Sequence, residues 1–147
     1  MPSFDQTVLR TERLRLRPLC EGDAPALFAI FSDVRVARYL SGPAWPSLDV
    51  AHERIARDLS AMSAGRYACF GIERASDGQL LGDCSLFNLH EASRRAELGY
   101  ALACAAWGQG YMHEALRALL GFGFSQLELN RVEADIDPRN LASAKSV

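Results

Sequence analysis

The stretch of the sequence best suited to binding an anion runs from Glu97 to His113. A strand expected over 95–102 leads into a loop containing Gly108 and Gly110, where a helix is expected to begin. The first turn of a helix leaves N–H groups unpaired and carries partial positive charge, and glycines let a ligand approach the backbone. The pattern therefore predicts a phosphate-binding loop. Spacing alone leaves a ligand-free strand–helix turn as the alternative.

Two common phosphate-binding motifs do not fit this loop. A dinucleotide fingerprint requires G-x-G-x-x-G after a parallel strand, and Gly108 and Gly110 are followed by His113 at the third glycine position. A nucleoside-triphosphate loop requires Gly-Lys followed by Ser or Thr, which occurs nowhere in the chain. Both of these ligand classes are excluded by the residues.

One carboxylate of the preceding strand is a candidate catalytic group. Glu97 is expected to share a strand face with Gly99 and Ala101, since side chains alternate between faces. A carboxylate beside two small residues indicates space for a ligand. The alternative is a structural ion pair of Glu97 with Arg95 or Arg131.

Composition limits the class of protein. The 147 residues are 49% hydrophobic and 23% charged, which is typical of one soluble domain. Sixteen basic against eighteen acidic residues give a net charge of −2, so no nucleic-acid partner is expected. The longest apolar run, 100–107, is shorter than the about 20 residues that a membrane span needs. Residues 1–6 lack a secretory signal pattern.

The cysteines favour a reducing compartment. Cys20, Cys69, Cys84 and Cys104 include no C-x-x-C pair, and their spacing matches neither a zinc site nor a disulfide framework. We expect reduced thiols that act as small core residues in a cytoplasmic protein, and no metal site.

Hydrophobic periodicity predicts one domain in which strands and helices alternate. Alternation over Leu9–Arg17 predicts a strand with Leu14 and Leu16 inward, and Asp77-Gly78 predicts a hairpin turn. Helical patterns are expected over 21–32, 34–40, 47–64 and 110–127, and further strands over 67–73, 80–88, 95–102 and 131–137. The three central strands form an antiparallel meander, and the segment 95–137 forms a parallel strand–helix–strand crossover.

Four segments, in order, resemble one known family. Residues 107–116, Trp-Gly-Gln-Gly-Tyr-Met-His-Glu-Ala-Leu, resemble the acetyl-CoA pyrophosphate loop of the GNAT N-acetyltransferases, and most of all its RimJ/RimL-like branch. Residues 11–17 resemble the opening strand of that branch, 96–100 its fourth strand, and 130–143 its fifth strand with an Asn-x-x-Ser helix start. Met112 departs from the pattern, because a small residue is expected there. Its side chain either narrows the space beside the pyrophosphate or points into the core.

The resemblance implies a fold and an activity. The fold is α+β (mixed α/β) and GNAT-like, a mostly antiparallel twisted sheet with one parallel crossover and helices on both faces. The activity is that of a bacterial, cytoplasmic acyltransferase, a monomer or homodimer that moves the acetyl group of acetyl-CoA, its cosubstrate, to a primary amine. The acceptor would be a protein N-terminal α-amine, such as that of a ribosomal protein, or a small molecule. A non-catalytic acyl-CoA-binding module and a plain scaffold remain alternatives.

The same resemblance implies the cofactor-binding residues. Backbone N–H groups of Gln109, Gly110, Tyr111, Met112 and His113 would face the pyrophosphate. Leu102, Ala103, Trp107 and Gly108 complete the set around the loop. Asn140, a helix cap in any interpretation, would contact the pantetheine arm. Ser143 would hydrogen-bond the CoA sulfur and help the thiolate leave, the alternative being a solvent-facing serine.

Amine acetylation also requires a group that removes a proton, because an amine nucleophile is protonated at neutral pH. Glu97 is the candidate base. His113 titrates near neutrality, but it would lie beside the pyrophosphate, far from the acetyl group. Cys84 is not expected to carry the acetyl group, since direct transfer fits the family better. Trp45 either borders the acceptor pocket or is an ordinary core residue.

The last expected helix raises a question about the fold's end. It would begin at Asn140 and has fewer than two turns before Val147. The family fold continues with the rest of that helix and two more strands. We therefore expect residues 1–147 to be a single acetyltransferase domain lacking most of its fourth helix and its last two strands, with one edge of the strand 131–137 uncovered.

Overall fold

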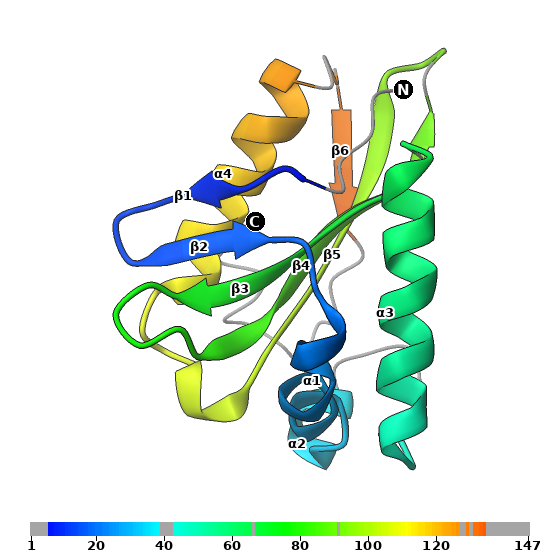
Figure 1. Ribbon diagram of the computed structural model, residues 1–147. Helices are drawn as coiled ribbons and strands as arrows, with labels where there is room; N and C mark the ends of the chain where they lie inside the picture. The colour runs from blue at the N-terminus through cyan, green and yellow to red at the C-terminus, as the bar shows by residue number, and fades with distance from the viewer. Residues whose placement is uncertain are drawn as a thin grey trace.

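The computed structural model describes residues 6–38, 43–65, 67–90, 92–126, 129 and 131–134, with the backbone alone at 88, 90, 126 and 131–134. One sheet of six strands has the order β1 to β6 (Figure 1). The first five pair antiparallel, and β6 returns parallel to β5, as predicted. They are β1 (Leu9–Arg10), β2 (Leu14–Arg17), β3 (Ala68–Arg74), β4 (Leu80–His90), β5 (Arg95–Leu102) and β6 (Arg131–Ala134).

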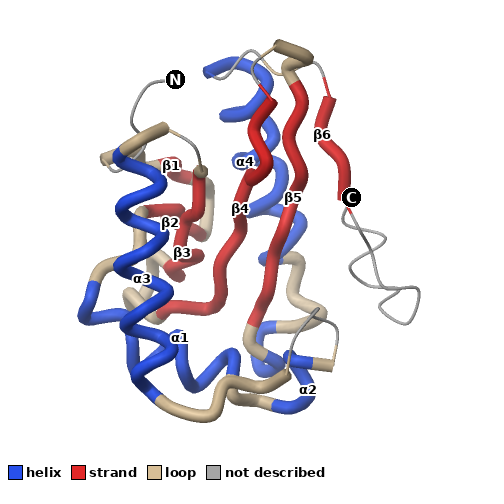
Figure 2. Tube along the Cα trace, turned by 90° about the vertical axis from the view of Figure 1, so that its right-hand side faces the viewer, coloured by secondary structure: helices blue, strands red, loops and turns tan. Residues whose placement is uncertain are grey.

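Helices cover both faces of this sheet. They are α1 (Ala24–Phe31), α2 (Val34–Ala37), α3 (Leu48–Ser63) and α4 (Tyr111–Gln126), with short 3₁₀ turns at Glu21–Asp23 and Cys104–Ala106. Figures 1 and 2 show α1 and α3 on one side of the sheet and α4 on the other. The α+β (mixed α/β) fold with its parallel β5–α4–β6 crossover is thereby confirmed. No helix within the described ranges is both long and apolar enough to cross a bilayer.

Strand register decides which residues of β5 face α3. Asp83 of β4 is bonded to Arg54 of α3, so Asp83 lies on the α3 face. Ala101 of β5 stands opposite Asp83, and directly opposed residues point to the same face. Because alternate residues of a strand share a face, Gly99 and Glu97 also lie on the α3 face.

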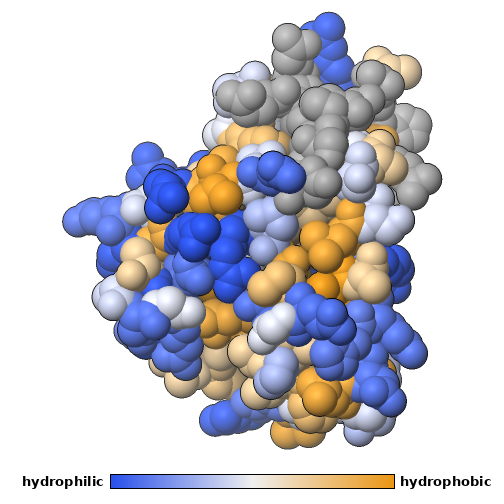
Figure 3. Space-filling view, in the orientation of Figure 1, coloured by the Kyte–Doolittle hydropathy of each residue, from blue (hydrophilic) through white to orange (hydrophobic). Residues whose placement is uncertain are grey.

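The opposite face of the sheet forms the core against α4. Phe70 of β3 meets Phe122 of α4 edge to face, with ring centroids 5.6 Å apart. The largest side chains buried on the two faces together are Leu14, Leu16, Leu27, Met62, Phe70, Ile72, Leu86, Leu116 and Leu119. The apolar residues visible in Figure 3 lie in separate patches between hydrophilic ones, an ordinary pattern for a folded domain.

Three local predictions need correction. The segment Leu9–Arg17 is two strands, because the chain reverses where Thr11 N–H donates to the carbonyl of Leu14 (2.9 Å). The helix expected from residue 21 begins as a 3₁₀ turn, and α2 ends at Ala37. Cys69 and Cys84 are buried, but Cys20 is exposed and Cys104 half-buried, so only two of the four free thiols are core residues.

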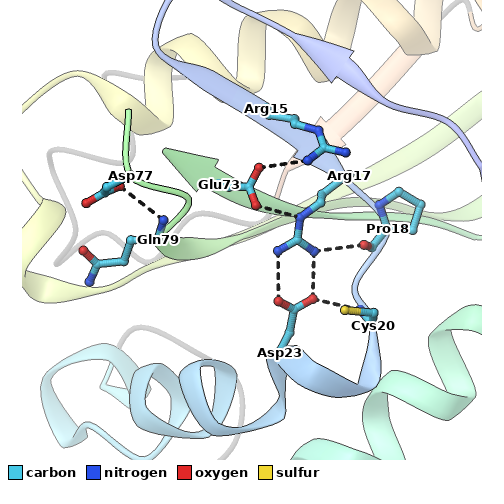
Figure 4. A network of polar contacts seen from close by, with 8 residues as sticks. All are labelled: Arg15, Arg17, Pro18, Cys20, Asp23, Glu73, Asp77 and Gln79. Carbon is cyan, nitrogen blue, oxygen red and sulfur yellow. Dashed lines mark hydrogen bonds and ion pairs between the residues drawn. The ribbon is translucent and has the colours of Figure 1, made fainter. Parts of the chain in front are cut away.

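An ion-pair network fixes the point where the chain leaves β2 for α1 (Figure 4). Arg17 pairs bidentately with Asp23 (Nη1–Oδ2 2.7 Å, Nη2–Oδ1 2.9 Å) and reaches Glu73 of β3 (Nε–Oε1 3.1 Å). Burial would raise the pKa of Asp23, but hydrogen bonds from Arg17 and from the Cys20 N–H outweigh it and lower that pKa. The network ties the sheet to the first helical layer.

This network predicts a pH-dependent part of the stability. Because the pKa of Asp23 is lowered in the folded state, its contribution is complete above the unfolded pKa near 4 and is lost as pH falls through the folded pKa. Asp23→Asn should reduce the free energy of unfolding by about 2 kcal/mol at neutral pH and flatten the acid limb. Urea unfolding from pH 7 to pH 2 measures both effects. Asp33→Asn, in an exposed pair with Arg35, is the control and should change stability little.

Candidate functional site

The loop between β5 and α4 has the backbone geometry that an anion site needs. Gly108 and Gly110 have φ of 77° and 79°, in the left-handed region that favours glycine. The helix begins at Tyr111, and Glu114 N–H donates to the carbonyl of Gly110 (3.1 Å). The first turn, Tyr111 to His113, therefore presents N–H groups that have no acceptor within the helix. The predicted strand–glycine loop–helix arrangement is confirmed.

The polar side chains of this loop fold back onto it. Trp107 Nε1 donates to the carbonyl of Leu102 (2.7 Å), and Gln109 Nε2 donates to the carbonyl of Ala105 (2.9 Å). Ala103 N–H is bonded to the carbonyl of Leu81 of β4 (2.8 Å), which fixes the start of the loop. The side chains thus close the turn, and the backbone of residues 108–110 is left exposed.

The first residues of α4 divide between core and surface. Tyr111 and Met112 are buried in the core, whereas His113 is exposed. The Met112 side chain therefore points into the core. Of the two alternatives for this residue, narrowing the space beside the pyrophosphate or pointing into the core, the structure has the second. Met112 can contribute its N–H group without narrowing the loop.

Sequence reasoning missed three residues that brace this loop. Glu114 of α4 accepts hydrogen bonds from the Thr11 hydroxyl, from the Arg13 N–H (2.9 Å) and from Arg13 Nε (2.8 Å). Arg13 also donates from Nη1 to the carbonyl of Gln109 (2.9 Å), and its guanidinium lies 4.4 Å from the ring centroid of Tyr111. We call Thr11, Arg13 and Glu114 the turn clamp. No spacing rule connects residues so distant in the sequence.

Within the turn clamp, Arg13 and Glu114 form an ionised pair. Burial would raise the pKa of Glu114, but hydrogen bonds from Thr11 and Arg13 lower it overall. The bond to Glu114 raises the pKa of Arg13. The Arg13 guanidinium beside the loop is therefore charged and is paired with the Glu114 carboxylate, which lies at the positive end of the α4 dipole.

Glu97 lies some distance from this loop, half-buried on the α3 face of β5. It stands opposite Phe87 of β4 and Glu133 of β6 in the strand register. Beside it, a Cβ added to Gly99 would lie 3.1 Å from both the Phe87 ring and the Ser85 hydroxyl. A side chain at position 99 would crowd these β4 neighbours, which gives glycine a structural reason at this position. The ligand space expected beside Glu97 stays a prediction.

The outer edge of β5 differs along its length. Residues 95–98 pair with β6. Residues 99–102 pair with no residue of β6 among those that the structure describes. This second half of β5 leads directly into the loop.

A buried ionic cluster holds α3 to the same face. Arg54 of α3 pairs with Asp58 (Nε–Oδ2 3.1 Å) and with Asp83, and lies 5.0 and 5.8 Å from the ring centroids of Phe31 and Trp45. Trp45 is half-buried and stacks on Phe31 with centroids 4.5 Å apart. Burial raises the pKa of Asp58 even though Arg54 opposes it.

Three candidate site residues remain, of which one is a buried thiol and two lie outside the described residues. Burial raises the pKa of the Cys84 thiol well above its ordinary value, so it cannot act as a nucleophile at neutral pH. Asn140 and Ser143 lie outside the described residues. Within the described ranges, no group of three or more His, Cys, Asp or Glu side chains is placed to hold a metal ion.

Comparison with known proteins identifies the class that this fold and loop define. The family model described as the acetyltransferase (GNAT) domain matches residues 13–146. The chain therefore belongs to the GNAT acetyltransferase family, and it is an acyltransferase. It is 33% identical over 137 residues to p20 of Bacillus licheniformis, named as an uncharacterised N-acetyltransferase, with 93% of this chain and 77% of p20 covered.

Solved structures agree with this class. An acetyltransferase of Agrobacterium tumefaciens superposes with a TM-score of 0.80 at 28% identity, covering 99% of this chain and 83% of that one. A Vibrio cholerae protein, provisionally assigned as a ribosomal-protein-serine acetyltransferase, superposes with a TM-score of 0.79 at 27% identity, covering 99% and 82%. Both similarities extend over nearly the whole chain.

The loop geometry predicts a specific effect of a side chain at Gly110. Gly110→Val should abolish acetyl-CoA binding, because a β-branched residue disfavours φ of 79° and its side chain would occupy the approach path of the ligand. Gly78→Val is the control: Gly78 has φ of 72° in the turn between β3 and β4, away from the loop, and a Cβ there meets nothing within 4 Å, so the affinity for acetyl-CoA should stay unchanged. Isothermal titration with acetyl-CoA measures both variants. Unchanged affinity in Gly110→Val would contradict the role of this loop.

Proposed function

We propose that this chain transfers the acetyl group of acetyl-CoA directly to a primary amine, and that the loop before α4 binds the diphosphate of the donor. The observation that carries the proposal is the pair of left-handed glycines, Gly108 and Gly110, immediately before the unpaired N–H groups of α4. Backbone recognition accounts for side chains at 107 and 109 that fold back onto the loop. Residues 109–113 are the proposed donors to the diphosphate.

The proposed path of the donor follows β5. At about 3.4 Å per residue, the five steps along the strand from Glu97 to Leu102 span roughly 17 Å. An extended pantetheine arm fits such a separation between a diphosphate at the loop and a thioester near Glu97. As the resemblance to the family implies, the backbone of this strand is the proposed partner of its amide groups. Leu102 and Ala103 mark the turn from strand to loop.

In the proposed reaction, Glu97 accepts a proton from the acceptor ammonium, directly or through a water molecule. The neutral amine attacks the thioester carbonyl, a C–N bond forms, and the C–S bond breaks as the thiolate leaves. We propose that Ser143 hydrogen-bonds that sulfur and that Asn140 contacts the pantetheine arm, as in the family that the sequence resembles. The nitrogen loses a further proton as the amide forms, and the departing thiolate gains one, so that the protons balance.

The proposed acceptor is the α-amine of a protein N-terminus, such as that of a ribosomal protein, with small-molecule amines as the second class. Support comes from the RimJ/RimL-like motif at 107–116 and from the similarity to the Vibrio cholerae protein assigned to ribosomal-protein acetylation. We place the reaction in the cytoplasm, and we take residues 1–147 as one acetyltransferase domain.

Two measurements test the proposed function. Titration calorimetry should show micromolar-range binding of acetyl-CoA and weak or no binding of NAD or ATP. A CoA-release assay is then run with peptides bearing a free or a blocked α-amine and with a panel of small amines. Turnover only with free α-amines supports the proposed acceptor. Binding without turnover would favour a non-catalytic acyl-CoA-binding module, and absence of binding a scaffold.

The assignment of Glu97 predicts a specific kinetic defect. Glu97→Gln keeps the shape and removes proton acceptance, so kcat at neutral pH should fall on the order of 10²-fold, while the affinity for acetyl-CoA stays unchanged. Glu53→Gln, at an exposed position of α3, is the control and should keep full activity. Steady-state kinetics with calorimetry separates the two parameters. Full activity in Glu97→Gln would transfer the proton-accepting role to another group.

A further inference from the structure

The turn clamp makes one contact that bracing α4 does not require. Besides its bonds to Glu114, Arg13 donates from Nη1 to the carbonyl oxygen of Gln109, 2.9 Å away. That oxygen belongs to the peptide unit that joins Gln109 to Gly110, inside the loop proposed to hold the diphosphate. Arg13 therefore reaches from the β1–β2 turn, 96 residues earlier in the chain, to a single peptide group of the site.

We propose that Arg13 is a positioning residue that aims the N–H group of Gly110 at the diphosphate of acetyl-CoA, an inference that rests on the function proposed above. The C=O and N–H of a trans peptide unit point in opposite directions. The described chain contains no cis peptide bond. With the Gln109 carbonyl held toward Arg13, the Gly110 N–H must point away from Arg13.

The orientation of this peptide unit needs to be fixed by a contact from outside the loop. The unit turns about ψ of Gln109 and φ of Gly110, and φ of Gly110 is less restricted than in other residues because glycine has no Cβ. If the unit rotated by half a turn, it would present its carbonyl oxygen, the negative end of the peptide dipole, to the diphosphate. A charge-assisted hydrogen bond from Arg13 to that oxygen opposes the rotation, because such bonds are stronger than neutral ones.

The surroundings of Arg13 allow its guanidinium one orientation. Nε is bonded to Glu114 (2.8 Å), Nη1 to Gln109, and the plane lies over the ring of Tyr111 at 4.4 Å. Glu114 is in turn held by the Thr11 hydroxyl and by the Arg13 N–H. The side chain is thus fixed on three sides although it is 41% exposed.

The test compares two acetyl donors. Acetyl-CoA carries the diphosphate, and S-acetylpantetheine carries the thioester arm without it. In Arg13→Ala, we expect kcat/KM with acetyl-CoA to fall on the order of 10- to 100-fold, mainly through KM. With S-acetylpantetheine, kcat/KM should stay within about twofold of the wild-type value, because no diphosphate is present to be misaligned.

A matched arginine separates positioning from general stability. Arg15 is 39% exposed and pairs with Glu73, away from the loop, so Arg15→Ala should leave kcat/KM with both donors unchanged. Arg13→Lys, which keeps the charge but not the planar fork, should lose part of the acetyl-CoA activity and keep a wild-type melting temperature. It serves as the folded variant if Arg13→Ala does not fold.

The amide of Gly110 supplies a second readout. In ¹H–¹⁵N spectra of the wild type, this resonance should shift when CoA is added, and the shift should be lost or reduced in Arg13→Lys. Equal losses with both donors, an equal effect of Arg15→Ala, or an unchanged KM for acetyl-CoA would each overturn the inference alone. A wild-type chain that binds no acetyl-CoA would instead overturn the proposed function, and this inference with it.

Discussion

The Glu114 carboxylate joins parts of the chain that lie 103 residues apart, and the geometry of the site depends on it. Its two oxygens accept from Thr11 and Arg13, so the β1–β2 turn is held against the first turn of α4. This contact sets where the helix begins relative to the sheet. Because the loop joins β5 of that sheet to α4, the contact also sets where the loop lies between strand and helix.

The two faces of the sheet are stabilised in different ways. On the α4 face, apolar side chains pack with few polar groups, and the edge-to-face contact of Phe70 with Phe122 is representative. On the α3 face, Arg54 holds Asp58 and Asp83 in a buried cluster. A buried charge needs its partners, so this cluster fixes α3 against β4. The half-buried Glu97 lies on the same α3 face.

The loop itself shows how a site can be built from backbone. The side chains of Trp107 and Gln109 donate hydrogen bonds to carbonyl groups of preceding residues, and Met112 points into the core. Residues 107–110, which include the two glycines, and the start of a helix lie at the surface. Such a site depends on the direction of each peptide unit, and these directions are set by contacts from outside the loop.

Periodicity and glycine placement in the sequence were enough to predict the sheet, the parallel return through β6 and the glycine loop before α4. These features are local: side-chain alternation, the helical repeat and the conformational freedom of glycine act over a few neighbouring residues. The resemblance of residues 107–116 to an acetyl-CoA loop was likewise visible there. The break at Thr11 was missed, although residues 10–13 contain no apolar residue and interrupt the alternation there.

Only the tertiary structure showed what surrounds Gly99 and what holds the loop. The strand register brings Phe87 and Ser85 of β4 against Gly99, so that a side chain there would be crowded. The sequence pattern predicts Arg13 as an outward-facing strand residue, whereas in the fold it donates hydrogen bonds to Glu114 and to the carbonyl of Gln109. Contacts between residues so distant in sequence follow from strand register and helix docking, which the whole core decides together and no short pattern records.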